Sequence, residues 1–154
     1  MSAEAIIKAI AARGWMLATA ESCTGGMIAA AITDIPGSSK ALERGFVTYS
    51  NEAKIEMLGV ARATLNTHGA VSEPVAAEMA RGALVHSHAH IAVSVTGIAG
   101  PGGSEHKPEG RVCFGIALGT SVRTETVEFG ALGRDAVRQA SVEHALEMVL
   151  EAVS

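Results

Sequence analysis

The chain has 154 residues, of which 48% are hydrophobic, 18% charged and only 3% aromatic, and its net charge is −4 with six histidines counted as neutral. This composition excludes a disordered chain and suits a domain whose core is built from Ala, Val, Ile and Leu. The acidic balance and the scarcity of aromatic side chains argue against nucleic-acid partners. No leader-like N-terminus and no run of about 18 apolar residues occurs, so we expect a cytoplasmic protein without a membrane partner.

The first part of the chain is predicted to alternate helix and strand. Apolar residues at helical spacing over residues 3–12 indicate a helix, and the apolar run 15–20 indicates a buried strand. A second helix is expected over residues 27–33. Ser38 is expected to cap a short helix that extends to Leu42.

The middle of the chain adds one strand and three helices. Residues 46–49 are β-branched or aromatic and predict a second strand. Asn51 is expected to cap a helix over residues 52–58, and a short helix should follow over 61–66. A Ser-Glu-Pro sequence marks the start of a longer helix over residues 72–85.

The last part is predicted to contain three strands and a closing helix. Residues 91–95 are β-branched and precede a loop rich in glycine and proline over residues 97–110. The segments 112–118 and 122–129 read as a hairpin. Apolar residues at helical spacing predict a helix over residues 133–153.

This order of elements predicts an α/β fold, a three-layer α/β/α sandwich over a mixed, mostly parallel sheet of about five strands. No internal repeat or long linker is visible, so we expect a single domain over residues 1–154. The loop over residues 97–110 is longer than a plain connection needs, which favours a functional role for it.

A group of reactive residues, Glu21-Ser22-Cys23-Thr24-Gly25-Gly26, lies where the first strand turns into a helix. Free N–H groups and the helix dipole at such a junction suit an anion, or a nucleophile attacking a group that becomes one. Ser22 can serve as a helix cap or as a nucleophile, and Cys23 competes with it. The residues alone leave both interpretations open.

A serine nucleophile in this chain needs a base, and no histidine occurs in the first 67 residues. Lysine is the base in Ser-Lys hydrolases, and Lys40, Lys54 and Lys107 are the candidates. Because the carboxyl ends of parallel strands share one edge of a sheet, Ser22, Tyr49 and Lys54 can converge there.

The sequence from Thr96 to Gly103 reaches the same edge of the sheet. Its glycines can turn N–H groups inward as a binding site for an anion, and Thr96 adds a hydroxyl group. Arg134 and Arg138 lie one turn apart at the start of the last helix, as solvated charges or as a clamp for a phosphate.

We expect neither a metal nor a cofactor. Cys23 and Cys113 form no C-x-x-C pair of the kind found in structural zinc sites. The histidine-rich tract over residues 86–90 has no nearby carboxylate or thiol, and it reads as an exposed polar loop.

Together these motifs resemble the CinA C-terminal domain family, which includes stand-alone nicotinamide mononucleotide amidohydrolases. The resemblance covers nearly the whole chain in order. The similar segments are residues 20–26, 45–51 with Lys54, 69–72 and 96–103, extended by residues 107–108 with Gly110 and by residues 129–130 with Arg134 and Arg138.

The resemblance implies a metal-free serine amidase that converts nicotinamide mononucleotide to nicotinate mononucleotide and ammonia, a salvage step in pyridine nucleotide metabolism. It implies Ser22 as the nucleophile, Lys54 as the base and Tyr49 as their partner. The substrate-binding residues that we expect are Thr24, Gly25, Gly26, Thr96, Gly97, Gly100 and, as a phosphate contact, Arg138.

Two other functions remain open from the sequence. The domain can be a non-catalytic nucleotide-binding module, or an interaction domain linked to competence and DNA-damage responses. The expected partner is a small-molecule nucleotide, and the composition permits a homo-oligomer.

Overall fold

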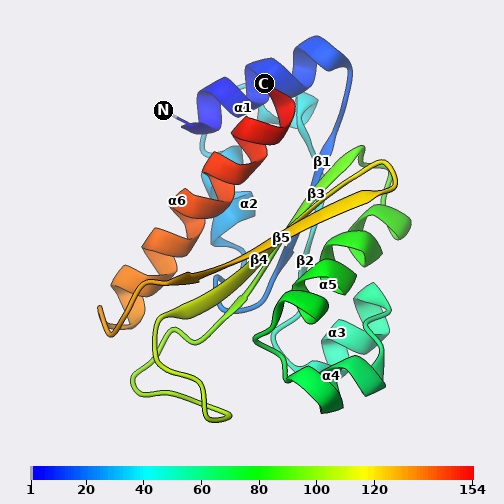
Figure 1. The fold of residues 1–154 in the computed structure, drawn as a ribbon. Helices are drawn as coiled ribbons and strands as arrows, with labels where there is room; N and C mark the ends of the chain where they lie inside the picture. The colour runs from blue at the N-terminus through cyan, green and yellow to red at the C-terminus, as the bar shows by residue number, and fades with distance from the viewer. Residues whose placement is uncertain (1) are drawn as a thin grey trace.

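The computed structural model describes residues 2–154, which form a five-stranded sheet with helices on both faces (Figure 1). The strands are β1 (Leu17–Glu21), β2 (Leu42–Val47), β3 (Ile91–Gly97), β4 (Arg111–Leu118) and β5 (Ser121–Glu128). The helices are α1 (Ser2–Arg13), α2 (Met27–Thr33), the 3-10 helix η1 (Ser38–Lys40), α3 (Asn51–Leu58), α4 (Arg62–His68), α5 (Glu73–Val85) and α6 (Arg134–Val153).

The sheet has the strand order β2-β1-β3-β4-β5. Strand β1 is parallel to β2 and β3, whereas β4 is antiparallel to both β3 and β5. Four strands therefore run in one direction and only β4 is reversed, which confirms the predicted mixed and mostly parallel sheet. The carboxyl ends of β1, β2 and β3 meet at one edge.

The helices form the two outer layers of the sandwich. Helices α1, α2 and α6 pack together on one face of the sheet, and α3, α4 and α5 cover the other (Figure 1). Side chains of the central strands alternate between the two cores: Ile91 and Val93 of β3 face α1 and α6, whereas Ala92 faces α5. Within residues 2–154, no helix combines the length and apolar character needed to cross a membrane.

The clearest difference from the predicted elements lies between α2 and β2. The helix expected from Ser38 to Leu42 is only the short η1, and Gly37 rather than Ser38 occupies its N-cap position. Leu42 instead begins β2, where it pairs with Leu17 of β1. Strand pairing with β1 thus overrides the local preference of these residues, which sequence patterns do not report.

Candidate functional site

Ser22 lies in a tight turn, residues 22–26, that connects the buried end of β1 to α2; we call this turn the Ser22 loop. Its N–H donates to the carbonyl of Val95 on β3 at 3.1 Å, and the residue is 7% exposed. Gly25 and Gly26 have φ angles of 58° and 105°. Side-chain-bearing residues rarely adopt these angles, so the glycine pair allows the chain to reverse direction beside Ser22.

Glu21, a residue whose role the sequence interpretation missed, holds the Ser22 loop from below. Its fully buried carboxylate accepts hydrogen bonds from the hydroxyl of Thr24 at 2.6 Å and from the N–H groups of Ile28 at 2.9 Å and Ala29 at 3.0 Å. Gly26 begins α2 without a side-chain cap, so Glu21 satisfies these N–H groups of the helix instead. The available signal was an acidic residue ending an apolar strand directly before a helix.

Lys54 contacts Ser22 from α3. The helix begins with Ser50 rather than Asn51 as its cap, since the Ser50 hydroxyl accepts from the N–H of Ala53 at 3.0 Å. This start brings the Lys54 side chain, only 1% exposed, beneath the Ser22 loop. Its Nζ donates to Ser22 Oγ at 3.1 Å, to the carbonyl of Thr48 at 3.0 Å and to that of Tyr49 at 3.3 Å.

The pKa shifts of Lys54 and Cys23 distinguish Ser22 from Cys23 as candidate nucleophiles. Burial lowers the pKa of Lys54 from its ordinary value, against smaller opposing effects of Cys23 and Glu105. Burial also raises the pKa of the Cys23 thiol to about 11, which leaves little thiolate at neutral pH. Cys23 packs into the core between the sheet and α2.

The other two candidate lysines do not join Ser22. Lys40 is exposed at the end of η1. Lys107 donates to the carbonyls of His68 at 2.7 Å and Val71 at 2.6 Å, and so fastens the loop after β3 to the chain before α5.

The loop after β3 borders an open hollow of about 250 Å³, lined by Val71, residues 97–105 and Arg134. Thr96 lies just below it and is 1% exposed; its hydroxyl donates to the carbonyl of Ala70 at 2.9 Å. Gly97 is required there, because a Cβ at this position would lie 2.7 Å from Cγ2 of Val112. Gly97 and Gly100, which the sequence predicts to contact the substrate, both line this hollow.

Arg134 connects the hollow to the Ser22–Lys54 pair. It donates through Nη1 to the carbonyl of Gly100 at 2.6 Å and through Nη2 to the hydroxyl of Tyr49 at 2.9 Å. The Tyr49 side chain is 62% exposed, and only its carbonyl accepts from Lys54. The hydroxyl of Tyr49, expected as a partner of Ser22 and Lys54, has Arg134 as its hydrogen-bond partner among the described residues.

Arg138, expected at the substrate phosphate, instead contacts the backbone of the Ser22 loop. Its Nε donates to the carbonyl of Cys23 at 3.1 Å, and its Nη2 donates to the carbonyl of Thr24 at 3.4 Å. These two contacts connect α6 to a turn more than a hundred residues earlier in the chain.

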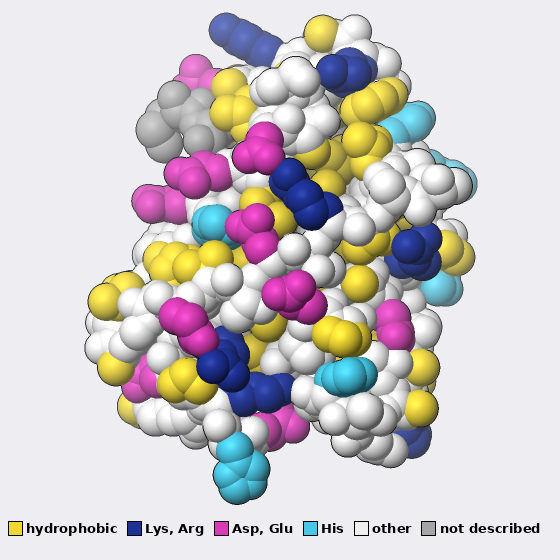
Figure 2. All heavy atoms as spheres, viewed as in Figure 1, with side chains coloured by type: hydrophobic (Ala, Val, Ile, Leu, Met, Phe, Trp, Pro, Cys, Tyr) yellow, Lys and Arg dark blue, Asp and Glu magenta, His cyan; other side chains and the backbone are white. Residues whose placement is uncertain are grey.

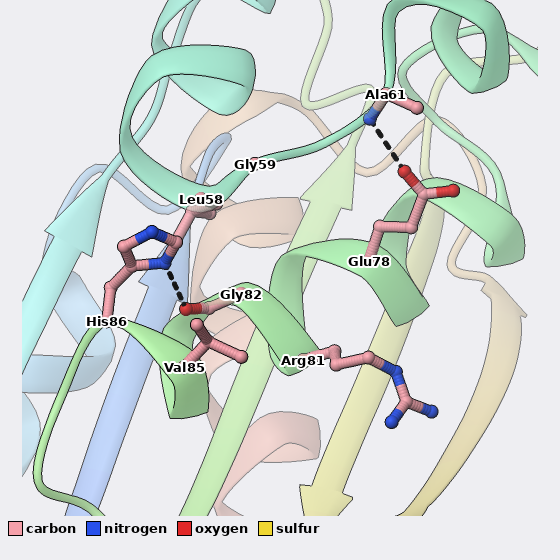
Figure 3. A pocket seen from close by; sticks show the side chains of 8 residues that line it. All are labelled: Leu58, Gly59, Ala61, Glu78, Arg81, Gly82, Val85 and His86. Atoms are coloured by element: carbon pink, nitrogen blue, oxygen red, sulfur yellow. Dashed lines mark hydrogen bonds between the residues drawn. The ribbon is translucent and has the colours of Figure 1, made fainter.

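A second hollow, of about 330 Å³, lies between the end of α3 and α5 and is lined by eight residues of these helices and their neighbours (Figure 3). Two of its polar side chains bond within the fold: Glu78 accepts from the N–H of Ala61 at 2.8 Å, and the ring of His86 contacts the carbonyl of Gly82 at 2.8 Å. A Cβ on Gly82 would lie 1.9 Å from the carbonyl oxygen of Leu58. This hollow therefore borders a seam of close helix packing and contains none of the predicted site residues.

The surface and the histidine tract add no further site. His86, His88 and His90 are exposed after α5, and among residues 2–154 no group of three His, Cys, Asp or Glu side chains is arranged to hold a metal. On the face drawn in Figure 2, Lys and Arg side chains are scattered among Asp and Glu.

Comparisons with known proteins agree with this architecture. The family model described as the CinA C-terminal domain matches residues 1–153. Nicotinamide-nucleotide amidohydrolase PncC of Escherichia coli K12 is 54% identical over 145 residues, which cover 94% of this chain and 88% of that protein. A putative competence-damage inducible protein of Symbiobacterium thermophilum is 51% identical over 95% of this chain, which spans only 36% of that longer relative.

Solved structures give the same result. The competence/damage inducible protein CihA of Agrobacterium tumefaciens superimposes with a TM-score of 0.94 at 51% identity, over 99% of this chain and 93% of that one. A CinA superfamily protein of Escherichia coli has a TM-score of 0.95 at 36% identity, over 98% of this chain and 88% of that one. With a matching family model, close relatives and the same fold, this chain belongs to the CinA C-terminal domain family.

Proposed function

We propose that residues 1–154 act as one amidohydrolase domain that converts nicotinamide mononucleotide to nicotinate mononucleotide and ammonia. The observation that carries the proposal is the buried contact of 3.1 Å between Ser22 Oγ and Lys54 Nζ. The relative from Escherichia coli, named a nicotinamide-nucleotide amidohydrolase and 54% identical over 94% of this chain, supports an amidohydrolase activity and its substrate.

In the proposed mechanism Lys54 is the base and Ser22 the nucleophile. A neutral lysine has two N–H groups and one lone pair. Its N–H groups can donate to the carbonyls of Thr48 and Tyr49, and the lone pair then faces Ser22 Oγ and accepts from the hydroxyl. Ser22 transfers its proton to this lone pair as Oγ attacks the carboxamide carbon. The resulting ammonium of Lys54 returns the proton to the leaving nitrogen, ammonia departs, and water hydrolyses the ester on Ser22.

The N–H groups of the Ser22 loop are suited to stabilise the oxyanion of this reaction. The N–H of Ser22 itself donates to Val95, and that of Gly25 donates to the carbonyl of Ser22. Within the described residues, the N–H groups of Thr24 and Gly26 have no acceptor. We therefore assign the oxyanion site to the free N–H groups of the Ser22 loop, next to Ser22 Oγ.

Arg134 is the better candidate for the substrate phosphate. Two of its five N–H donors are used by Gly100 and Tyr49, and within residues 2–154 the remaining three have no acceptor. Arg134 also lines the hollow, so these donors can serve a phosphate bound there. Arg138 is assigned a positioning role, because its guanidinium contacts the carbonyls of Cys23 and Thr24.

The pH dependence follows from the base. Only neutral Lys54 can accept the proton of Ser22, and burial lowers the pKa of this lysine. We expect kcat/KM to rise with pH and to reach a plateau, because protons leave Lys54 as the pH increases. The apparent pKa of this rise should lie below the ordinary value of a lysine. Ammonia release measured from about pH 5 to about pH 10 gives this profile. A flat or falling profile would rule out a lysine base.

The proposed function is tested with purified protein and nicotinamide mononucleotide. We expect ammonia and nicotinate mononucleotide to appear in equal amounts, and free nicotinamide, which lacks the ribose phosphate, to react poorly. Binding of the nucleotide without ammonia release would instead indicate a nucleotide-binding module. Failure to bind it, with a specific protein partner, would indicate an interaction domain.

A further inference from the structure

A second charged side chain, Glu105, lines the hollow together with Arg134. Glu105 lies in a tight turn, residues 104–107, which we call the Glu105 turn. The turn is closed by two hydrogen bonds, from the N–H of Ser104 to the carbonyl of Lys107 at 3.0 Å and from the N–H of Lys107 to the carbonyl of Ser104 at 2.8 Å. The hollow thus has groups of opposite charge on its wall.

The backbone of the Glu105 turn is unusual for its sequence. Glu105 and His106 have φ angles of 51° and 63°, in the left-handed region that Gly, Asn and Asp adopt most readily. Placing a glutamate there costs free energy, about 1 kcal/mol or more. A glutamate kept in a backbone conformation that costs it free energy indicates a function for the Glu105 side chain.

The fold holds the Glu105 turn at the hollow. The Lys107 ammonium fastens its end to the carbonyls of His68 and Val71. The carboxylate packs beside Gly69, where a Cβ would lie 3.2 Å from Glu105 Oε2 and 2.9 Å from Lys107 Nζ, so the Lys107 ammonium is a neighbour of this carboxylate. Among the described residues, no hydrogen bond or ion pair occupies this carboxylate.

The charge of Glu105 also reaches the Ser22–Lys54 pair. Its carboxylate favours the protonated lysine and so raises the pKa of Lys54, against the larger effect of burial. In the free protein this influence opposes the role of Lys54 as a base. A positive charge bound beside Glu105 would offset it, so the arrangement favours substrates that carry a cation next to the reacting amide.

We propose that Glu105 is a specificity-determining residue that contacts the cationic pyridinium ring of the nucleotide, while Arg134 faces its phosphate. This inference rests on the proposed function. A nicotinamide joined to ribose through its ring nitrogen carries a positive charge there, and the phosphate at the other end is negative. Glu105 and Arg134 match these two charges on the wall of one hollow.

The test compares Glu105→Gln with the unchanged protein on two ligands of nearly the same shape. The first is nicotinamide mononucleotide, and the second is its 1,4-dihydro form, whose ring is neutral. For Glu105→Gln we expect KM and Kd for the cationic nucleotide to rise about five- to tenfold, with kcat at saturation changed less than about twofold. The Kd for the dihydro form should stay the same.

Two matched variants control for the turn itself. Glu105→Asp keeps the charge and should retain much of the preference for the cationic ligand. His106→Asn changes the neighbouring residue of the turn, tolerates the same backbone, and should leave both Kd values unchanged. Equal losses for both ligands in Glu105→Gln, or no loss for either, would overturn the role of Glu105. Absence of ammonia release by the unchanged protein would overturn the proposed reaction instead, and the two Kd values would still report on Glu105.

Discussion

Replacing Ser22 with alanine is expected to lower kcat for ammonia release from nicotinamide mononucleotide by about 10⁴-fold or more. The substitution removes only Oγ, so no acyl group can be transferred to the protein. Ser22 is nearly buried, and its hydroxyl has one side-chain partner, Lys54 Nζ at 3.1 Å. Loss of one such hydrogen bond should cost about 1 kcal/mol of unfolding free energy, which thermal unfolding measures.

Cys23→Ala is the matched control, because it removes the neighbouring nucleophilic atom from the same loop. Cys23 packs in the core and burial raises the pKa of its thiol to about 11, so we expect this variant to keep most of its activity. An active Ser22→Ala together with an inactive Cys23→Ala would reverse the assignment of the nucleophile.

Lys54→Met is expected to lower kcat by about 10³-fold, within the range usual for loss of a general base. Methionine fills a similar volume among the buried groups around Lys54, which is 1% exposed. The carbonyls of Thr48 and Tyr49 lose a donor, so stability should fall by about 1–3 kcal/mol for each carbonyl that water cannot reach. Residual activity should also lose the rise with pH described above.

Lys40→Met is the matched control for Lys54→Met, because it replaces a lysine outside the candidate site with the same residue. Lys40 is exposed on η1, and this variant should keep kcat within about twofold of the unchanged protein. If Lys54→Met retained normal turnover and a normal pH profile, Lys54 would not be the base.

The fold was largely predictable because each central element carries a strong local signal. The apolar run over residues 15–20 overlaps most of β1, and the β-branched run over residues 91–95 forms the first part of β3. Ser72 caps α5 as expected, accepting from the N–H of Val75. The meeting of Ser22 with Lys54 followed from strand direction, since parallel strands bring their carboxyl ends to one edge.

The directions of individual side chains could not be predicted in the same way. Tyr49 presents its carbonyl to Lys54, whereas its hydroxyl accepts from Arg134, which lies 85 residues later in the chain. The sequence shows Arg134 and Arg138 as equivalent charges on one helix face. Only the packing of α6 against the Ser22 loop distinguishes the arginine that lines the hollow from the one that contacts Cys23.

The contact of Arg138 with Cys23, across 115 residues, has a consequence for the timing of biosynthesis. A chain leaving the ribosome contains Ser22 and Lys54 long before α6 has been made. The turn that carries Ser22 lacks its partner on α6 until that helix has emerged and docked. We therefore expect the domain to become active only after its final helix has been synthesised. A chain truncated before α6 would contain both Ser22 and Lys54 but would release no ammonia.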